Sequence, residues 1–446
     1  MKKYLILVFT ILLSFTLFAC GDKTENLGEV IDFSETHGKK TELRVWLDDE
    51  KGEYMEAIIK EFNKIYPNIY VRFLHKGSVE SREQLKTFGP SGNGADVFQF
   101  PHDHLAQAIL EDLVLALPSD TKQRVEARSH ELGVQIATLS YNEETHSFDP
   151  NDPNAVESLY AVPMSIESVG LYYNKDLVET PAATYEELFA AADIWNNSPF
   201  GGDESGRTNA EANNYYLTTS SHWADSYFMQ HIYSAFGFYP FGETLDDPSE
   251  VGFANAEEAL VWMREELKPR TTGNGDHESV GGAGFEAGDV PYIIAGPWNN
   301  EAYKNAGLNY GVAPLPTIDG KETKSFAGAM MAAVYKYSKN QEAAIKFVEF
   351  LSSDIAMQLQ YDYKQKLPAL KGELLVNIEG VLEDELLMAM SRQLETSIPM
   401  PTIPQVTYYW GPGETMIKDT WNGEELISKL VTDAEHSYRT NVGLGQ

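Results

Sequence analysis

The chain has 446 residues, of which 43% are hydrophobic and 23% charged, and 67 acidic against 34 basic residues give it a formal net charge of −33. This length is enough for two or three domains, each with its own core, and the composition is typical of a globular protein in water. The acidic balance argues against nucleic acid as a partner, because phosphate contacts need clustered lysine and arginine, and against adsorption to an anionic membrane surface.

The N-terminus has the form of a secretory signal peptide. A pair of lysines precedes an apolar run over 5–18, and the only cysteine of the chain, Cys20, follows directly after that run. The run is too short for a stable transmembrane helix, and its end resembles the lipobox of bacterial lipoproteins, whose cysteine is lipidated and becomes the mature N-terminus. Residues 21–40 are polar with little apolar periodicity, so we expect a flexible tether between the membrane and the folded body.

The segment 42–100 alternates between strand and helix patterns. We predict strands over 42–47, 69–74 and 96–100, and helices over 53–66 and 81–88. Such a β-α-β-α-β order predicts a mainly parallel sheet covered by helices. Ligands of open α/β sheets bind beyond the carboxyl ends of the strands.

A second organising feature is the stretch 160–176. It begins apolar, is interrupted by Pro163 and resumes as a strand-like run over 169–173. Because proline cannot donate to a sheet ladder, we expect the chain to leave one sheet near Pro163 and to enter another. Glu167 would then border a cleft between domains, although an ordinary strand with one exposed glutamate is the alternative. Leu315 and Pro316 begin a second candidate crossing.

The remaining chain continues the mixture of helices and strands. The expected helices are 184–195, 256–267, 341–352, 373–398 and 424–436. The expected strands are 159–162, 310–312 and 329–334. The expected loops are 199–214, the glycine-rich segment 281–289 and the proline-punctuated segment 399–410.

Several residue groups could carry chemistry. The glycine-rich segment 281–288 lacks the Lys-Ser/Thr pair of a P-loop, so we predict a turn-forming loop before a helix. The pair His102 and His104 has no third partner at metal spacing, so we expect no metal site. Asp103, Glu167 and Asp225 could serve as the acid and nucleophile of a glycoside hydrolase, or could accept hydrogen bonds from sugar hydroxyls. Spacing alone leaves both alternatives open.

Tryptophans in loops favour a carbohydrate ligand. Trp298 follows Gly296-Pro297, and Trp410 ends a proline-punctuated loop after two tyrosines. Flat aromatic rings match the C–H face of a pyranose, while carboxylates and amides hold its hydroxyl edge. A core position is the alternative for either ring taken singly.

These features together resemble the bacterial extracellular solute-binding proteins of ABC importers, most closely the maltose/maltodextrin-binding proteins, over residues 42–435. The segments that carry the resemblance are Val45-Trp46-Leu47 with Lys51-Gly52; Ala95-Asp96-Val97-Phe98 with His102-Asp103; Glu167 with Leu171-Tyr172-Tyr173-Asn174-Lys175-Asp176-Leu177; Phe285, Gly288 and Gly296-Pro297-Trp298; Asn309-Tyr310-Gly311-Val312 with Leu315-Pro316-Thr317; and Pro401-Thr402-Ile403-Pro404-Gln405 with Trp410.

The resemblance implies a set of ligand-binding residues. Hydroxyl-binding groups match Glu50, Lys51, Asp103, Glu167, Asp225 and Tyr227, and stacking rings match Phe100, Trp298 and Trp410. Phe100 stands where a tryptophan is usual, Asp48 replaces a common asparagine, and His104 and Glu414 stand where arginine is common.

The resemblance also implies a type II periplasmic-binding fold, with two α/β lobes, mixed sheets flanked by helices and a hinge. The lobes would comprise 41–163 with 317–371, and 164–316 with 372–446. The implied function is that of a lipid-anchored monomer, without cofactor or metal, at the extracellular face of the cytoplasmic membrane (the periplasmic side if an outer membrane exists). It would deliver maltose or maltodextrin oligosaccharides to an importer permease. A different oligosaccharide, a sensory role and a secreted glycosidase are the alternatives.

Overall fold

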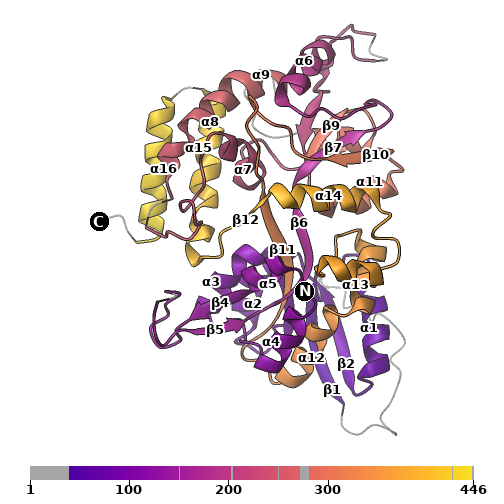
Figure 1. Cartoon of the computed structure of the whole chain (residues 1–446), viewed down its shortest axis with the longest axis vertical. Coiled ribbons are helices and arrows are strands. Elements are labelled where there is room, and N and C mark those ends of the chain that lie inside the picture. Colours follow the sequence, from indigo (N-terminus) through magenta and orange to yellow (C-terminus); the bar gives the residue numbers. More distant parts are fainter. Residues whose placement is uncertain are drawn as a thin grey trace, which may run out of the picture.

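The computed structural model describes residues 40–149, 151–201, 204–249, 251–271, 281–423 and 425–443. The predicted signal peptide, Cys20 and the predicted tether lie outside the described residues. The elements form two α/β bodies, one above the other in Figure 1, with β6, β11 and α14 between them.

The lower body is built on a six-stranded sheet in the order β12-β11-β3-β1-β2, with β6 also paired to β11. Its strands are β1 (Thr41–Leu47), β2 (Ile69–His75), β3 (Val97–Pro101), β6 (Val162–Ser168), β11 (Phe326–Val334) and β12 (Ile398–Pro399). Its helices are α1 (Glu53–Ile65), α2 (Ser78–Phe88), α3 (Leu105–Leu110), α4 (Ser119–Glu126), α5 (Glu131–Ala137), α12 (Gln341–Leu351) and α13 (Asp354–Lys364). A hairpin of β4 (Thr138–Tyr141) and β5 (Val156–Leu159) projects from it.

The predicted parallel unit at the start of the chain is confirmed. β1 pairs in parallel with both β2 and β3. Helix α1 forms because its apolar residues recur at helical spacing, and Met55, Ile58, Ile59 and Phe62 are buried against the sheet. The loops after β1 and β3 therefore lie at the same edge of the sheet, where the sequence predicts a ligand.

The upper body has a four-stranded sheet in the order β10-β7-β9-β8. Its strands are β7 (Gly170–Asn174), β8 (Leu217–Thr219), β9 (Tyr292–Ala295) and β10 (Tyr310–Ala313). Its helices are α6 (Tyr185–Asn196), α7 (Ser226–Ala235), α8 (Glu257–Trp262), α9 (Lys268–Thr271), α10 (Gly281–Glu286), α11 (Asn300–Asn305), α15 (Trp410–Asn422) and α16 (Ile427–Asn441). Helix α14 (Glu385–Thr396) lies between the two bodies (Figure 1).

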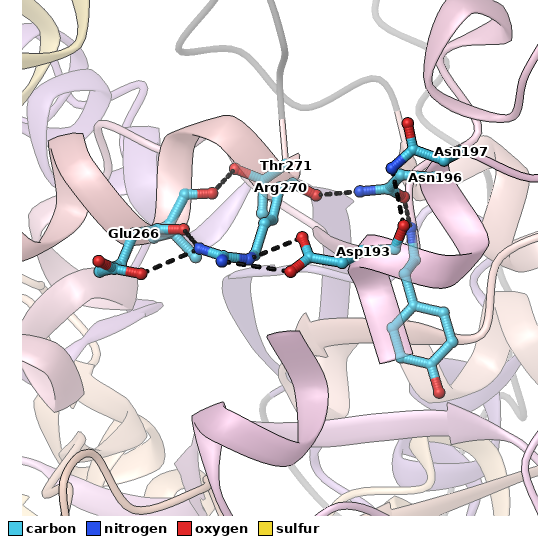
Figure 2. A network of polar contacts seen from close by, with 8 residues as sticks. Asp193, Asn196, Asn197, Glu266, Arg270 and Thr271 are labelled. Carbon is cyan, nitrogen blue, oxygen red and sulfur yellow. Dashed lines mark hydrogen bonds and ion pairs between the residues drawn. The ribbon is translucent and has the colours of Figure 1, made fainter. Parts of the chain in front are cut away.

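A polar network at the top of this body fixes α9 against α6 (Figure 2). Arg270 Nε donates to Asp193 Oδ1 over 3.0 Å, and its Nη1 donates to Glu266 Oε2 over 3.0 Å. Asn196 Nδ2 donates to the Arg270 carbonyl over 2.8 Å. These contacts join two helices of one body, so we assign the network to the fold.

Hydrophobic side chains separate into two main cores. One core draws on residues within 43–166 and 329–387, and the other on residues within 169–318 and 406–438. We propose that these cores correspond to the two predicted lobes. Because side chains from 375–387 pack on the first core, we propose that the first lobe extends beyond its predicted end at residue 371.

Several local predictions were wrong. The expected strand 159–162 falls across the gap between β5 and β6, and the expected helix 373–398 is a 3-10 helix, Gly372–Asn377, followed by the separate helix α14. Pro163 lies inside β6 opposite Met331, beside a register shift that tolerates its missing N–H, so the chain changes sheets at Val169 instead. Most of the glycine-rich segment 281–288 forms helix α10, which ends at Glu286, instead of a loop. Trp410 begins helix α15 instead of lying in a loop.

The three segments that connect the bodies meet in a buried hydroxyl cluster. Ser168 is the last residue of β6, Ser325 directly precedes β11 and Ser397 directly precedes β12. Ser168 Oγ lies 2.7 Å from Ser325 Oγ, and Ser325 Oγ lies 3.0 Å from Ser397 Oγ. Gln393 of α14 donates from Nε2 to Ser325 Oγ over 3.0 Å and accepts the Leu315 N–H over 2.8 Å. One hydrogen-bonded group thus fixes all three connections.

Candidate functional site

Tyr227 lies at the centre of an aromatic arc. Its ring centroid is 6.3 Å from that of Trp298 and 6.1 Å from that of Phe326, which stacks on it at 30°. Phe326 in turn meets Trp410 edge to face at 6.3 Å. The arc brings together two predicted stacking residues, Trp298 and Trp410, that are more than a hundred positions apart in the sequence.

Trp298 is placed by the turn that follows β9. The segment Pro297–Asn299 forms a single 3-10 turn, and the indole folds back over Gly296. A Cβ at Gly296 would lie 2.2 Å from Cη2 of Trp298, so the position requires glycine. Phe228 supports the indole edge to face at 6.0 Å, and 39% of Trp298 remains exposed. An exposed, supported ring is suited to stacking on a ligand.

The negative charges of three carboxylates act on the phenol of Tyr227. Burial raises the pKa of Tyr227 well above its ordinary value, and the negative charges of Glu167, Asp103 and Asp225 raise it further. The phenol therefore stays protonated and is available as a hydrogen-bond donor. Four predicted site residues, from the turn after β3, from β6 and from the start of α7, thus lie near one another.

Asp103 is a buried carboxylate close to the end of β3. It lies in a one-turn 3-10 helix, His102–His104, directly after β3, and it is 7% exposed. Within the described ranges, no hydrogen bond to its side chain is found. A buried carboxylate of this kind favours a ligand that donates hydrogen bonds.

His102 ties this turn to the connecting segments. The Ala329 N–H donates to its Nδ1 over 3.3 Å, so Nε2 donates to the Met400 carbonyl over 3.2 Å. Burial lowers the pKa of His102, which keeps the ring neutral and both bonds intact. A Cβ at Gly328 would lie 2.7 Å from the ring, so this close approach requires glycine. The histidine has a structural role here. Across the described part of the chain, no group of three His, Cys, Asp or Glu residues could hold a metal ion.

Glu167 lies on β6 opposite Gly328 of β11 and is 5% exposed. Its Oε2 accepts a hydrogen bond from Lys366 Nζ over 3.1 Å. The residue thus borders the change from β6 to β7, as predicted. Lys366 was not predicted, because no local pattern around it distinguishes it from an exposed lysine.

Asp225 accepts hydrogen bonds from its own helix and from Ser221, which the sequence did not indicate. Its Oδ1 caps helix α7 by accepting the N–H groups of Tyr227 and Phe228 over 2.9 and 3.3 Å. Its Oδ2 accepts Ser221 Oγ–H over 2.5 Å. Because these donors already occupy both oxygens, the carboxylate orients Tyr227 through the helix cap.

The prediction for Phe100 as a stacking ring is wrong for this structure. The side chain is fully buried and stacks on Phe98 at a centroid distance of 4.9 Å and an angle of 28°. Residues two apart on a strand share a face, so Phe98 and Phe100 both point into the core of the first body. No ring surface of Phe100 is left for a ligand.

Glu50 and Lys51 lie at a separate cavity of about 200 Å³, which Glu301 and Tyr363 also line. Both predicted residues are exposed, and Lys51 Nζ forms an ion pair with Glu301 Oε1 at 2.7 Å. The hydrogen bond with Glu301 raises the pKa of Lys51. Since Lys51 precedes α1 and Glu301 belongs to α11, this ion pair joins the two bodies. Tyr227 is not among the residues that line this cavity.

Asn300 supplies a second link between the bodies, because its Nδ2 donates over 3.1 Å to the carbonyl of Gln365 at the end of α13. No local pattern in the sequence indicates this link or Glu301, because both depend on how α11 meets the first body.

Within the described ranges, none of the helices combines the length and apolarity needed to cross a membrane.

Comparisons with known proteins agree on one family. A family model described as bacterial extracellular solute-binding protein matches residues 48–358. The galactooligosaccharide-binding protein of Bacillus subtilis (strain 168) is 28% identical, over 95% of this chain and 93% of that protein. The maltooligosaccharide ABC transporter solute-binding lipoprotein of Streptococcus pneumoniae (strain R6) is 28% identical, over 97% of this chain and 96% of that protein. The crystal structure of MalX from Streptococcus pneumoniae in complex with maltopentaose superposes with a TM-score of 0.75 at 26% identity, covering 90% of this chain and 100% of that one.

Proposed function

The chain belongs to the bacterial extracellular solute-binding proteins, and from this premise we propose that it binds maltodextrin oligosaccharides between its two lobes and delivers them intact to an ABC importer. This family comprises solute-binding proteins, not enzymes, so the carboxylates are assigned to binding instead of to glycoside hydrolysis. The fold is that of a type II periplasmic-binding protein, in agreement with the sequence prediction.

The observation that supports a sugar ligand best is the arc from Trp298 through Tyr227 and Phe326 to Trp410, with the acids Asp103 and Glu167 beside its centre. Aromatic faces stack on the C–H surfaces of glucose rings, and each charge-assisted hydrogen bond to a hydroxyl contributes about 1.5–3 kcal/mol. The relatives named for maltooligosaccharides support the maltodextrin class.

The proposed mechanism is closure of the lobes on the ligand. The connections at Ser168, Ser325 and Ser397 form the hinge, while Lys51–Glu301 and Asn300–Gln365 join the lobes at the cleft rim. A ligand that contacts both lobes binds the closed form better and shifts the population toward it. The importer would recognise that closed form.

We also propose that Cys20 is lipidated and anchors the protein at the extracellular face of the cytoplasmic membrane, with a monomeric body. The lipoprotein naming of the relative from Streptococcus pneumoniae supports this assignment. Mass spectrometry of the protein from its native membrane tests it: acyl chains on Cys20 are expected, and an unmodified cysteine in a full-length N-terminus would contradict it.

A galactooligosaccharide is the second candidate ligand, because one relative of similar identity carries that name. Isothermal titration of the purified protein with maltotriose and with a galactotriose separates the two. We expect tight one-to-one binding of maltotriose without release of reducing sugar. Preference for the galactoside would replace the proposed sugar, and steady release of glucose would contradict a binding role.

A further inference from the structure

The pair Lys366–Glu167 is a largely enclosed ion pair of the ligand site. The side chains are 17% and 7% exposed, and Nζ lies 3.1 Å from Oε2. Pairs of this kind are screened less by water and salt than pairs on the surface, and removal of one partner leaves the other charge buried. The pair is therefore able to fix the geometry of the glutamate.

Backbone hydrogen bonds place Lys366 beside β6. The Ile166 N–H donates to the Leu367 carbonyl over 3.2 Å, and the Ala369 N–H donates to the Met164 carbonyl over 3.1 Å. The segment after α13 thus runs along β6, with Lys366 near Glu167. These bonds place the main chain at Lys366, and the ion pair with Glu167 places its ammonium.

The lysine occupies only one oxygen of the carboxylate. Oε2 of Glu167 accepts the Lys366 ammonium, and no other residue in the described ranges hydrogen-bonds to Oε1. Glu167 lies opposite Gly328 of β11, two residues from Phe326, so its side chain and the ring of Phe326 are on the same face of the sheet. The negative charge of Glu167 also raises the pKa of Tyr227 in the aromatic arc. Oε1 is therefore the oxygen left to accept a hydrogen bond from a ligand.

The neighbouring cations have other partners. Lys364, at the end of α13, donates to Asp49 over 2.7 Å, and Lys51 pairs with Glu301. The intervening Gln365 has φ 51° and accepts Asn300 of the other lobe at its carbonyl. This left-handed residue separates the two lysines, so that each meets a different carboxylate.

We propose that Lys366 is a positioning residue of the ligand site, which acts through Glu167 by holding its carboxylate so that Oε1 accepts a sugar hydroxyl. The inference rests on the proposed function and extends it, because Lys366 itself touches no ligand in this assignment. Its effect on affinity should therefore depend on the presence of the Glu167 carboxylate.

A double-mutant cycle tests this dependence on the full chain, with maltotriose as the probe in isothermal titration. We expect Lys366→Met to weaken binding about tenfold, which corresponds to the loss of about one oriented hydrogen bond. Lys366→Arg keeps the charge and should stay within about threefold of the wild type. In a Glu167→Gln background, Lys366→Met should change the affinity by less than about twofold.

Lys364→Met is the matched control, since it removes a cation from the same turn that pairs with a different acid. Whatever effect it has should be the same in the wild type and in the Glu167→Gln background. Thermal unfolding of each variant reports stability separately. If Lys366→Met alone does not fold, the variant Lys366→Met/Glu167→Gln, which removes both charges, replaces it, and its affinity should equal that of Glu167→Gln.

Two results would overturn the proposal. One is an unchanged affinity in Lys366→Met, and the other is a loss of equal size in both backgrounds, which would show that Lys366 acts on the ligand directly or on the fold. Failure of the wild type to bind maltotriose would refute the proposed sugar instead. The same cycle would then be measured with the galactotriose, and the same two results would overturn the role of Lys366 as a positioning residue.

Discussion

Replacement of Gln393 by leucine should destabilise the connection between the lobes. Gln393 is fully buried, accepts the Leu315 N–H at Oε1 over 2.8 Å and donates to Ser325 Oγ over 3.0 Å. Leucine has a similar volume, so the change removes the polar contacts without opening a large cavity. The position isolates the hydrogen bonds of the hinge from its packing.

The magnitude follows from the groups left behind. Each lost hydrogen bond costs about 1 kcal/mol net, and a buried N–H without a partner costs about 1–3 kcal/mol. Leu315 is 6% exposed, so water does not replace the lost acceptor. We therefore expect Gln393→Leu to lower the free energy of unfolding by about 2–4 kcal/mol.

Urea unfolding followed by circular dichroism measures this change. Gln123→Leu is the matched control, because Gln123 is exposed on α4 and its side chain makes no hydrogen bond to the residues that the structure describes. The control should stay within about 0.5 kcal/mol of the wild type. A loss below about 1 kcal/mol for Gln393→Leu would refute the reasoning, since it would show that the Leu315 N–H finds another partner.

Three further predictions concern the site and its surroundings. Trp298→Ala should weaken maltotriose binding about ten- to hundredfold in titration calorimetry, because a stacking face is lost, and an unchanged affinity would remove Trp298 from the site. Gly296→Ala should also weaken binding, because the new Cβ displaces the indole of Trp298. Gly282→Ala is the control and should leave the affinity unchanged, because a Cβ there meets no atom within 4 Å. Equal affinities of the two variants would contradict the packing of Trp298 on Gly296. Burial lowers the pKa of His231 from 6.5 to about 4, so the unfolded chain takes up a proton at a higher pH than the folded protein, and stability is lost as pH falls from 6.5 toward 4. Urea unfolding should therefore show a loss between pH 6.5 and 5 that is about 2 kcal/mol larger in the wild type than in His231→Gln, and equal losses in both would contradict it.

Local patterns predicted the elements whose residues interact along the sequence. Simple periodicity of apolar residues predicted β1, α1, β2 and β3. The strand-like runs on either side of it predicted the change of sheet between β6 and β7. The position of that change was wrong because a bulge next to Pro163 was invisible in one strand read alone. The partner strand β11 follows more than 150 residues later.

In the site, too, local patterns predicted some residues and missed those that depend on distant segments of the chain. Trp298 and Trp410 were predicted from their loop-like surroundings and the family resemblance, and the structure joins them through Tyr227 and Phe326. The prediction for Phe100 was wrong because it rested on the family resemblance alone, and in this structure the side chain is fully buried in the core. Lys366 was missed because its role depends on a segment that pairs with β6 across 200 positions of sequence.

A crystal structure of the protein with maltotriose tests the central claim most directly. The account predicts glucose rings stacked on Trp298 and Trp410 between the two lobes, with sugar hydroxyls within hydrogen-bond distance of Asp103 and Oε1 of Glu167. A sugar bound on another surface, with both tryptophans and both carboxylates free of ligand, would contradict it.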